Sequence, residues 1–586
     1  MLEHNQIAMS MLAMAETLRT QHPPKLKMAI KCARGALKLN LSPETVAHCQ
    51  LQLGKLLLFY TDHYEIARQH LHYAYESLTT MGDFYVLKRL EALSLLCDLY
   101  IHSQMWPMNT ILGLIRKEMG YAKQFSHYHH KLLLYFIEAC KIERNTKAAL
   151  DACDLAIQSI ESHKPMELYF RITKHLVRYQ MLREEPDPQD VLQIGAMIKE
   201  LEQNPIMEFH LKNIKGFFMC TKLAFMLSEG LSRTSRSLLR QLQHEVTTTS
   251  KDCINGIRWM DETAMTVFAC VMTVVSAVVQ CSYDRAYKYH MIAIKHADDI
   301  ITKSTRTPQE FAVVRCINQM KMTSLELMAT CNIMACRPDA CLNNMRDMII
   351  FSSRCGGEIL QREFEPHLQY LLGMLCSYTK QYDLAERHFA SAIEMYSKRG
   401  NDSNILCLLY VNLALTYLNQ MKLVEYYDIA AHLAPSRIAD CSPMVRNNVK
   451  FLNAIYYHLN QKPNECKSVI HELLQDAKAE DFFRLHGLAL LMLSLLAPVD
   501  ETSVKPTVDW SKKSYDHAVV LWSHNFYAKL LSRRGEDTTE IMAEITKSFD
   551  ALNVDHLIRQ SMESQAANLV NWVDGNVHDY MPKDDL

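Results

Sequence analysis

Glycine and proline are scarce in this sequence, and their scarcity restricts the fold. The 586 residues include only 16 glycines and 17 prolines, about 3% each, whereas average proteins contain roughly 7% and 5%. Both residues interrupt helices and form turns, so a chain with few of them favours long continuous helices. We therefore predict an all-α protein. Its length predicts several domains or an extended array of repeats.

The chain also lacks an excess of charge and a long apolar run. Its formal net charge is −2 and it has no basic arm, which argues against a dedicated DNA-binding domain. The longest uncharged stretch, from Thr263 to Cys281, contains threonines, a serine and a glutamine and has no basic flanks. We predict a buried helix there rather than a membrane span. The 18 cysteines lie mostly in apolar stretches, and no signal peptide follows Met1, so we expect reduced thiols in a nuclear or cytosolic protein.

Motifs of known catalytic sites are missing as well. The sequence has no phosphate-binding loop, no dinucleotide-binding fingerprint and no nucleophile elbow. The stretch HELLQ at 471–475 has Gln475 where a zinc protease needs a second histidine, and the histidines of SHYHH at 126–130 do not share one helix face. We predict that the protein is not an enzyme and binds no cofactor, metal or small-molecule substrate. The alternative is an enzyme within the irregular middle of the chain.

Two stretches, 47–80 and 366–398, share a spacing of small and large residues. In each, a Leu-Gly pair is followed after a turn by two alanines and a large residue, spaced by four and then three. Residues so spaced lie on one side of a helix, and a glycine on the facing helix lets the two helices approach closely. This is the pattern of the tetratricopeptide repeat, a helical hairpin of about 34 residues. The residues that we assign to this packing are Leu53, Gly54, Ala67, Leu71, Ala74, Leu372, Gly373, Tyr382, Ala385, Phe389 and Ala392.

Weaker copies of the pattern follow along the chain. In one of them Ala454 and Cys466 are the two small residues, and Leu372 and Leu413 of successive copies are 41 residues apart. At about 40 residues per pair, we predict roughly 13 to 14 hairpins in a right-handed solenoid. We divide the chain into N-terminal repeats, an irregular helical middle, regular repeats, and C-terminal helices with a short frayed tail: 1–200, 201–360, 361–500 and 501–586. A loop is predicted at 497–513, and the stretch LVNWVDG is predicted to end the last helix at Gly575.

Stacked hairpins of this kind form a concave groove lined by the first helix of each pair. Counting from the glycine of each repeat, the groove candidates are His48, Leu51, Lys55 and Phe59 in the first stretch and His367, Tyr370, Met374 and Tyr378 in the second. Aromatic residues dominate contact energy in protein interfaces, so such a groove suits an extended partner chain. The alternative is that these residues pack against the next hairpin. A clamp for a peptide carboxylate, as in co-chaperones, is not expected, because only Lys55 has the required chemistry.

Two stretches that the repeat pattern does not require, AEDFFRL at 479–485 and LVNWVDG at 569–575, carry a family resemblance. With HPPKLKMAIKC, NPIMEFHLKNIKGFFM and the two repeats above, they resemble the helical-repeat subunit of the cohesin-loading complex, the maternal-uncoordinated (Mau) type. The resemblance implies a non-enzymatic scaffold whose superhelix encloses the extended N-terminal segment of a large HEAT-repeat loader of the adherin or Nipped-B kind. It also implies indirect association with cohesin and chromatin, a role in sister-chromatid cohesion and chromosome segregation, and location in the nucleus, with the cytoplasm as a further location. The alternative is a tetratricopeptide scaffold of another assembly, such as a ubiquitin ligase.

Overall fold

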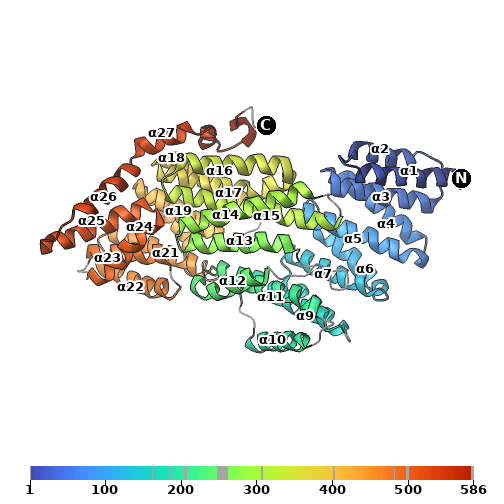
Figure 1. Ribbon diagram of the computed structural model, residues 1–586, viewed down its shortest axis with the longest axis horizontal. Helices are drawn as coiled ribbons and strands as arrows, with labels where there is room; N and C mark the ends of the chain where they lie inside the picture. Colours follow the sequence, from blue (N-terminus) through green and yellow to red (C-terminus); the bar gives the residue numbers. More distant parts are fainter. Residues whose placement is uncertain are drawn as a thin grey trace. The chain divides into compact units, whose positions relative to one another are not determined.

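The computed structural model describes residues 2–160, 163–184, 187–203, 208–246, 260, 262–304, 308–399, 403–480, 482–496 and 501–582. Within these ranges the chain forms 27 α-helices, joined by short turns and a few short 3-10 segments, and no strand (Figure 1). The all-α prediction is confirmed. Among the helices in these ranges, none combines the length and the apolar character needed to cross a membrane.

The helices group into two compact units. Unit 1 consists of Met1–Thr221, Thr248–Glu262 and Ile300–Arg315, and unit 2 of Lys222–Thr247, Thr263–Asp299 and Cys316–Leu586. The boundary falls inside helices α11, α13, α14 and α15, so the structure divides the irregular middle between both units. The first helices of the chain are α1 (Leu2–Thr20), α2 (Leu26–Ala36), α3 (Pro43–Tyr60), α4 (Tyr64–Thr80), α5 (Val86–Ser103), α6 (Met108–Ala122), α7 (Ser126–Ile142), α8 (Thr146–Ser159), α9 (Lys164–Met181), α10 (Pro188–Glu202) and α11 (Glu208–Ser228).

The remaining helices belong mainly to unit 2. They are α12 (Ser232–Val246), α13 (Glu262–Val279), α14 (Tyr283–Lys303), α15 (Pro308–Met334), α16 (Pro338–Phe351), α17 (Gly357–Tyr378), α18 (Tyr382–Arg399), α19 (Ser403–Asn419), α20 (Leu423–Ala430), α21 (Pro443–Leu459), α22 (Pro463–Ala479), α23 (Phe483–Leu496), α24 (Glu501–Ser514), α25 (His517–Arg534), α26 (Thr539–Ala551) and α27 (Val554–Glu563). Successive helices pack as antiparallel pairs, with α3·α4, α17·α18, α1·α2 and α21·α22 among the most extensive contacts. The loop predicted at 497–513 is wrong, because α24 occupies most of it.

A single kind of turn joins the two helices of many pairs. In the α17·α18 turn the N–H of Gln381 donates to the carbonyl of Cys376 at 2.8 Å and the N–H of Lys380 donates to Ser377 at 3.2 Å. With Lys380 at a φ of 58°, this is a Schellman motif, which satisfies the last carbonyls of the first helix. In the part of the chain that the structure describes, eight turns have this pattern, and their left-handed residues are Arg144, Gly230, Cys281, Cys336, Lys380, Met421, Gln461 and Gly535.

Glycine is the usual residue at this left-handed position, because a Cβ there is strained by about 1 kcal/mol. In these eight turns only Gly230 and Gly535 are glycines, in keeping with the low glycine content of the chain. Three of the eight turns, at 230, 281 and 336, lie in the middle that the sequence pattern predicts to be irregular. All three belong to unit 2, so the paired-helix architecture continues through the part of the middle that lies in this unit.

Close helix crossings occur where the sequence places its two Leu-Gly pairs. A Cβ built on Gly54 would lie 2.7 Å from the side chain of Leu71, and one on Gly373 would lie 2.6 Å from the ring of Phe389. Both distances are far below van der Waals contact. The large residue four positions after the first alanine therefore covers the glycine in each hairpin. Ala454 and Cys466 also face each other, with the Cys466 thiol donating to the Ala454 carbonyl at 3.2 Å.

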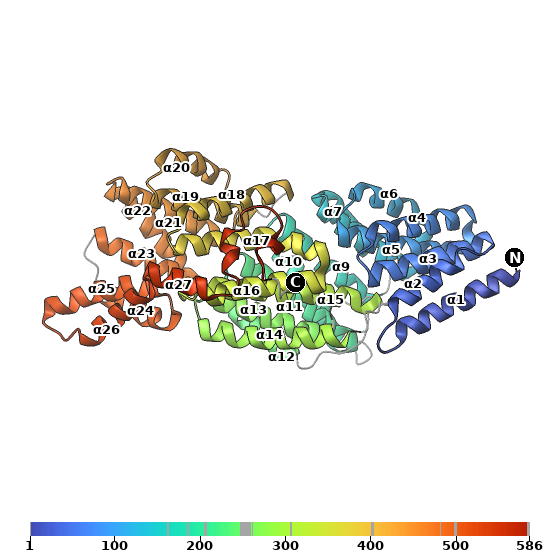
Figure 2. The ribbon, with the colours of Figure 1, turned by 90° about the horizontal axis from the view of Figure 1, so that it is seen from above.

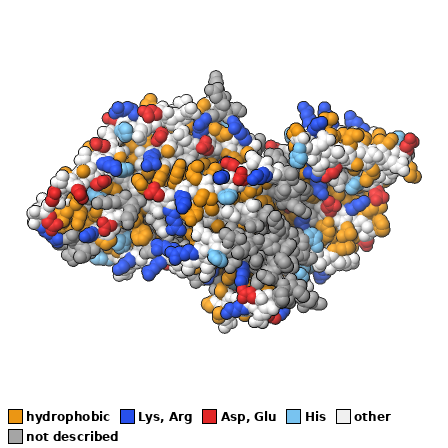
Figure 3. Space-filling model, viewed as in Figure 1, with side chains coloured by type: hydrophobic (Ala, Val, Ile, Leu, Met, Phe, Trp, Pro, Cys, Tyr) orange, Lys and Arg blue, Asp and Glu red, His pale blue; other side chains and the backbone are white. Residues whose placement is uncertain are grey.

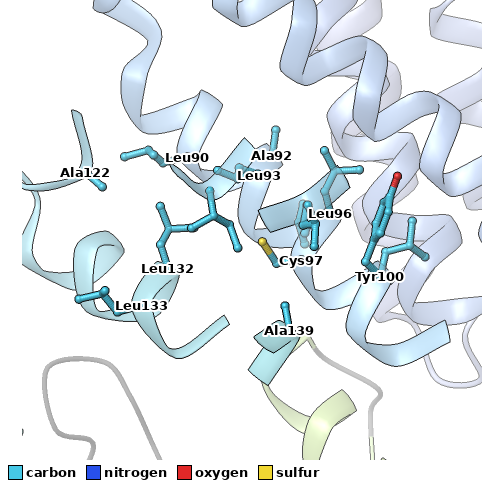
Figure 4. Packing of buried hydrophobic residues seen from close by; sticks show 14 of the residues in the cluster. Leu90, Ala92, Leu93, Leu96, Cys97, Tyr100, Ala122, Leu132, Leu133 and Ala139 are labelled. Atoms are coloured by element: carbon cyan, nitrogen blue, oxygen red, sulfur yellow. The ribbon is translucent and has the colours of Figure 1, made fainter. Parts of the chain in front are cut away.

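The core of unit 1 is continuous from α1 to α11 and consists of leucine, alanine and other apolar residues of successive helices. Figure 4 shows part of it, where Leu93 and Cys97 of α5 lie opposite Leu132 and Ala139 of α7. All four side chains are buried. Burial raises the pKa of the Cys97 thiol well above its ordinary value, so this cysteine is a neutral core residue.

We predicted a short frayed tail, but its described part, which ends at residue 582, contains buried side chains and a 3-10 turn. After α27 ends at Glu563 the chain continues through two 3-10 turns, Ala567–Asn571 and Val577–Tyr580, and residues 583–586 lie outside the described ranges. Trp572, Val577 and Met581 are buried. Gly575 has the predicted left-handed backbone, with a φ of 80°, but it lies between these two turns instead of ending a helix. Residues 564–582, called the strap below, lie against α16, α17 and α18 of unit 2 in both ribbon views (Figure 2).

Candidate partner-binding surface

The groove candidates of unit 1 separate into buried and accessible residues. Leu51 and Phe59 are only 1% and 6% exposed and belong to the apolar core. They support α3 from within and are not on an open face. His48 and Lys55 are partly exposed, so these two residues remain as contact candidates on the first helix of the repeat.

Charged side chains of two neighbouring helices surround His48. Lys55 of α3 pairs with Glu91 of α5 at 3.3 Å, and Lys88 of α5 pairs with Glu44 of α3 at 3.6 Å. Burial, followed by the positive charge of Lys88, lowers the pKa of His48. Because such surface ion pairs contribute about 0–1 kcal/mol each, a ligand with its own charges can replace them at small cost.

The polar row continues from α5 to α7. The Tyr135 hydroxyl donates to the Asp98 carboxylate at 2.6 Å, and the Lys131 ammonium lies 5.5 Å from the centre of the Tyr135 ring. Burial raises the pKa of Asp98, while Lys131 and the Tyr135 hydrogen bond act in the opposite direction. Three successive first helices, α3, α5 and α7, thus present histidine, lysine, carboxylate and tyrosine groups in sequence. We call this set the α3–α5–α7 surface.

In unit 2 the corresponding candidates contact other helices. His367 binds Glu326 of α15 through Nδ1 at 2.8 Å and Tyr396 of α18 through Nε2 at 2.7 Å. Asn412 of α19 donates to the Tyr370 hydroxyl at 3.5 Å.

The other two candidates of this hairpin are also engaged within unit 2. Met374 packs against the core of α18 to α21. Burial, followed by the negative charge of Asp516, raises the pKa of Tyr378 well above its ordinary value. For this hairpin the structure supports the alternative interpretation, in which the four residues pack against neighbouring hairpins.

Sequence reasoning missed a polar site on the opposite side of the same hairpin. Gln369 donates through Nε2 to the carbonyl of Trp572 at 3.1 Å, and His388 contacts the carbonyl of Val570 through Nε2 at 3.0 Å. Ser391 donates to the carbonyl of Val573 at 3.2 Å. Gln369 stands where the repeat consensus has tryptophan, and this substitution was the one available signal of a contact outside the repeat pattern.

Metal ligands do not gather in the part of the chain that the structure describes: no three His, Cys, Asp or Glu side chains lie together there as a possible metal site. His129 and His130 of the SHYHH stretch are buried in unit 1. Burial lowers the pKa of His130 to about 4. His130 is therefore a neutral core side chain with Phe170 as its ring neighbour, at a centroid distance of 5.8 Å.

Comparison with known proteins gives relatives over the whole length. Maternal uncoordinated protein 2 of Caenorhabditis elegans is 48% identical over 591 residues and covers 100% of both chains. The MAU2 chromatid cohesion factor homolog of Drosophila willistoni is 23% identical and covers 97% of this chain and 86% of its own. The match extends through the parts where the repeat pattern is weak.

Solved structures share the fold. The crystal structure of Scc4 in complex with Scc2n matches with a TM-score of 0.55 at 12% identity, over 96% of this chain and 99% of that chain. Scc4 in complex with Scc2n and Ctf19n matches with a TM-score of 0.57, over 94% and 99%. The family described as cohesin loading factor matches residues 9–538. This chain belongs to the cohesin loading factor family.

Proposed function

We propose that the protein is the scaffold subunit of a cohesin loader, which holds the N-terminal segment of the large, Nipped-B-type loader subunit and so promotes placement of cohesin on chromatin. In this role it acts in the nucleus, supports sister-chromatid cohesion and chromosome segregation, and catalyses no reaction itself. ATP hydrolysis and the main DNA contacts belong to its assembly partners.

Family membership carries this proposal. The family match spans residues 9–538, and the worm relative is similar from end to end. Scc4, which has the same fold, was crystallised with a segment of Scc2. A solenoid suits such a partner, because a disordered chain bound along successive repeats buries more surface than a compact domain of the same length.

The α3–α5–α7 surface is the part of unit 1 that we assign to the loader segment. It offers cationic and acidic groups in weak ion pairs and the aromatic ring of Tyr135, and its buried layer, which includes Leu51 and Phe59, is rigid. Rigid backing lowers the ordering cost of binding. A segment with alternating charges would break the ion pairs of Lys55 and Lys88 with Glu91 and Glu44 and form new ion pairs with these side chains.

A titration of the labelled N-terminal segment of the same organism's loader into the full chain tests the proposal. We expect tight binding to the wild-type chain and at least fivefold weaker binding to the Lys55→Glu, Lys88→Glu double variant. Lys117→Glu on α6 is the matched control, since Lys117 is exposed and lies on the second helix of its pair. Phe59 is left intact because truncation of a core residue would unfold the hairpin.

The possible outcomes separate the function from the surface. Absence of binding to any variant would overturn the loader function. Equal affinity of the wild-type chain and the double variant would leave the function standing and remove the α3–α5–α7 surface as the place of contact.

A further inference from the structure

The two clear repeats share a second pair of residues besides their glycines. Gln50 and His70 of α3·α4 occupy the same repeat positions as Gln369 and His388 of α17·α18, four residues before the glycine and three after the first alanine. In both hairpins the histidine Nδ1 contacts the glutamine Oε1, at 2.7 Å in α17·α18. This contact leaves the glutamine Nε2 and the histidine Nε2 of each pair to bind other groups.

In unit 2 this pair binds main chain. Gln369 Nε2 and His388 Nε2 contact the carbonyls of Trp572 and Val570, two residues apart in the strap. Both side chains are fully buried beneath it. The pair therefore recognises the backbone of a peptide, whatever its side chains.

In unit 1 the equivalent surface is uncovered. Gln50 and His70 are only partly buried, and no described residue hydrogen bonds to Gln50 Nε2 or His70 Nε2. On the same side of α4, Ile66 and Tyr73 are 37% and 49% exposed. Tyr73 occupies the position of Ser391, which donates to a strap carbonyl in unit 2. The surface thus has polar groups for a backbone and apolar side chains beside them.

A row of cations adjoins this surface. The exposed side chains of α2 and its C-terminal end include Lys27, Lys31, Arg34 and Lys38, spaced by four, three and four residues along one face. Positively charged side chains gather over α2 at the upper right of Figure 3. Helix α2 packs against α3, the helix of Gln50. Burial, followed by the positive charge of Arg34, lowers the pKa of His70.

We propose that the face formed by Gln50, His70, Ile66, Tyr73 and the cation row of α2 is a second binding site, for an extended acidic peptide segment of a protein partner. Gln50 and His70 bind two of its carbonyls, as their counterparts bind the strap. Ile66 and Tyr73 contact an apolar side chain between them, and the α2 cations pair with its carboxylates. A peptide is favoured over nucleic acid because the equivalent surface of the same chain holds a peptide.

The strap sequence itself is the probe for this site. A fluorescein-labelled peptide of residues 564–582, which contains Asp574 and Asp579, is titrated into the full chain, whose own strap remains in place. We expect saturable binding that weakens at least tenfold in the Gln50→Leu, His70→Leu double variant and severalfold in Tyr73→Ala. Gln69→Leu on the exposed side of α4 is the matched control. The Lys31→Glu, Arg34→Glu variant should weaken binding at 50 mM salt and abolish most of its salt dependence.

Three results would overturn the proposal. The first is no binding to the wild-type chain at the solubility limit of the peptide. The second is binding that is insensitive to Gln50, His70 and Tyr73 but lost in the His388→Leu variant, which would mean exchange with the strap of unit 2. The third is displacement of the peptide by a 30-base-pair DNA duplex whose binding requires Lys31 and Arg34 but not Gln50 and His70. That result would mean that the cation row binds nucleic acid. The exposed Tyr73→Ala variant keeps the test valid if the double variant is unstable.

Discussion

The hairpins α3·α4 and α17·α18 have the same internal packing but different surroundings. Each has a glycine beneath a large side chain and a Gln–His pair at equivalent positions. In α17·α18 the strap covers that pair, whereas in α3·α4 the pair is partly exposed. The repeat pattern therefore determines how two helices meet, and residues outside the pattern determine what binds to their outer faces.

Overpacking of either helix crossing should cause the largest loss in the free energy of unfolding. Gly373→Leu places a side chain where even a Cβ would clash with Phe389, and Gly54→Leu does the same against Leu71. We expect a loss of about 3 kcal/mol in the free energy of unfolding of the affected unit, measured by denaturant titration with hydrogen exchange to identify the unit. Gly120→Leu on α6, which has open space around it, should be neutral or slightly stabilising. Equal effects at all three glycines would contradict the shared packing.

Removing the buried Trp572 ring from the strap should affect α17·α18 but not α3·α4. Trp572→Ala deletes a fully buried ring. We expect the free energy of unfolding of unit 2 to fall by about 2–3 kcal/mol. The usual loss for a core aromatic is about 3–5 kcal/mol, and the smaller value is expected because the strap can detach. Amide exchange should accelerate in residues 564–582 and around His388 and remain unchanged in α3·α4. Phe549→Ala, at an exposed aromatic on α26, is the control. A strap that stays protected in the variant would show that its hydrogen bonds suffice without the ring.

The two glutamines provide a matched test of burial. Gln369→Leu leaves the Trp572 carbonyl without its donor in a buried site and should cost about 1–3 kcal/mol. Gln50→Leu breaks the equivalent contact to His70 on a partly exposed surface, where water replaces it, and should cost under about 0.5 kcal/mol. Thermal unfolding of both variants under identical conditions gives the comparison. Equal losses of stability in the two variants would mean that the hydrogen bonds to the strap contribute no stability beyond that of the Gln–His contact.

The turns of the two hairpins should respond in opposite directions to glycine. Lys380 is left-handed in the α17·α18 turn, so Lys380→Gly should stabilise unit 2 by about 1 kcal/mol. The α3·α4 turn contains no left-handed residue, and Thr61 is extended there with a φ of −143°. Asp62→Gly should therefore be neutral or destabilising. A gain in the melting temperature for both variants would contradict the difference in turn geometry.

The hairpins could be predicted from the sequence because close helix packing needs small residues at fixed spacing, as at Gly54 and Gly373. The middle of the chain was predicted to be irregular because its helices lack the spacing of small residues that marks the repeat. Two of its three turns also have Cys281 and Cys336 at the left-handed position, where glycine would have been a visible signal. The strap was predicted as a helix end and a frayed tail, because contacts made through main-chain carbonyls leave no periodic pattern in the sequence. Trp572 gave no direct indication of its partner.

The groove candidates show a second limit. Counting positions along the repeat identified His48 and Lys55, which the structure leaves partly exposed, and also Leu51 and Phe59, which it buries. A consensus position gives the direction of a side chain within one hairpin. Whether a neighbouring helix covers that side chain depends on the length and tilt of the next pair, which the spacing of one repeat does not contain.

Co-expression of this chain with the N-terminal few hundred residues of the same organism's Nipped-B-type loader, followed by size-exclusion chromatography with light scattering, tests the central claim most directly. We predict one peak with the mass of a one-to-one complex that persists on dilution, and protection of α3, α5 and α7 from hydrogen exchange in that peak. Two separate peaks with the masses of the single chains would contradict the proposed function, while the paired-helix fold would remain unaffected.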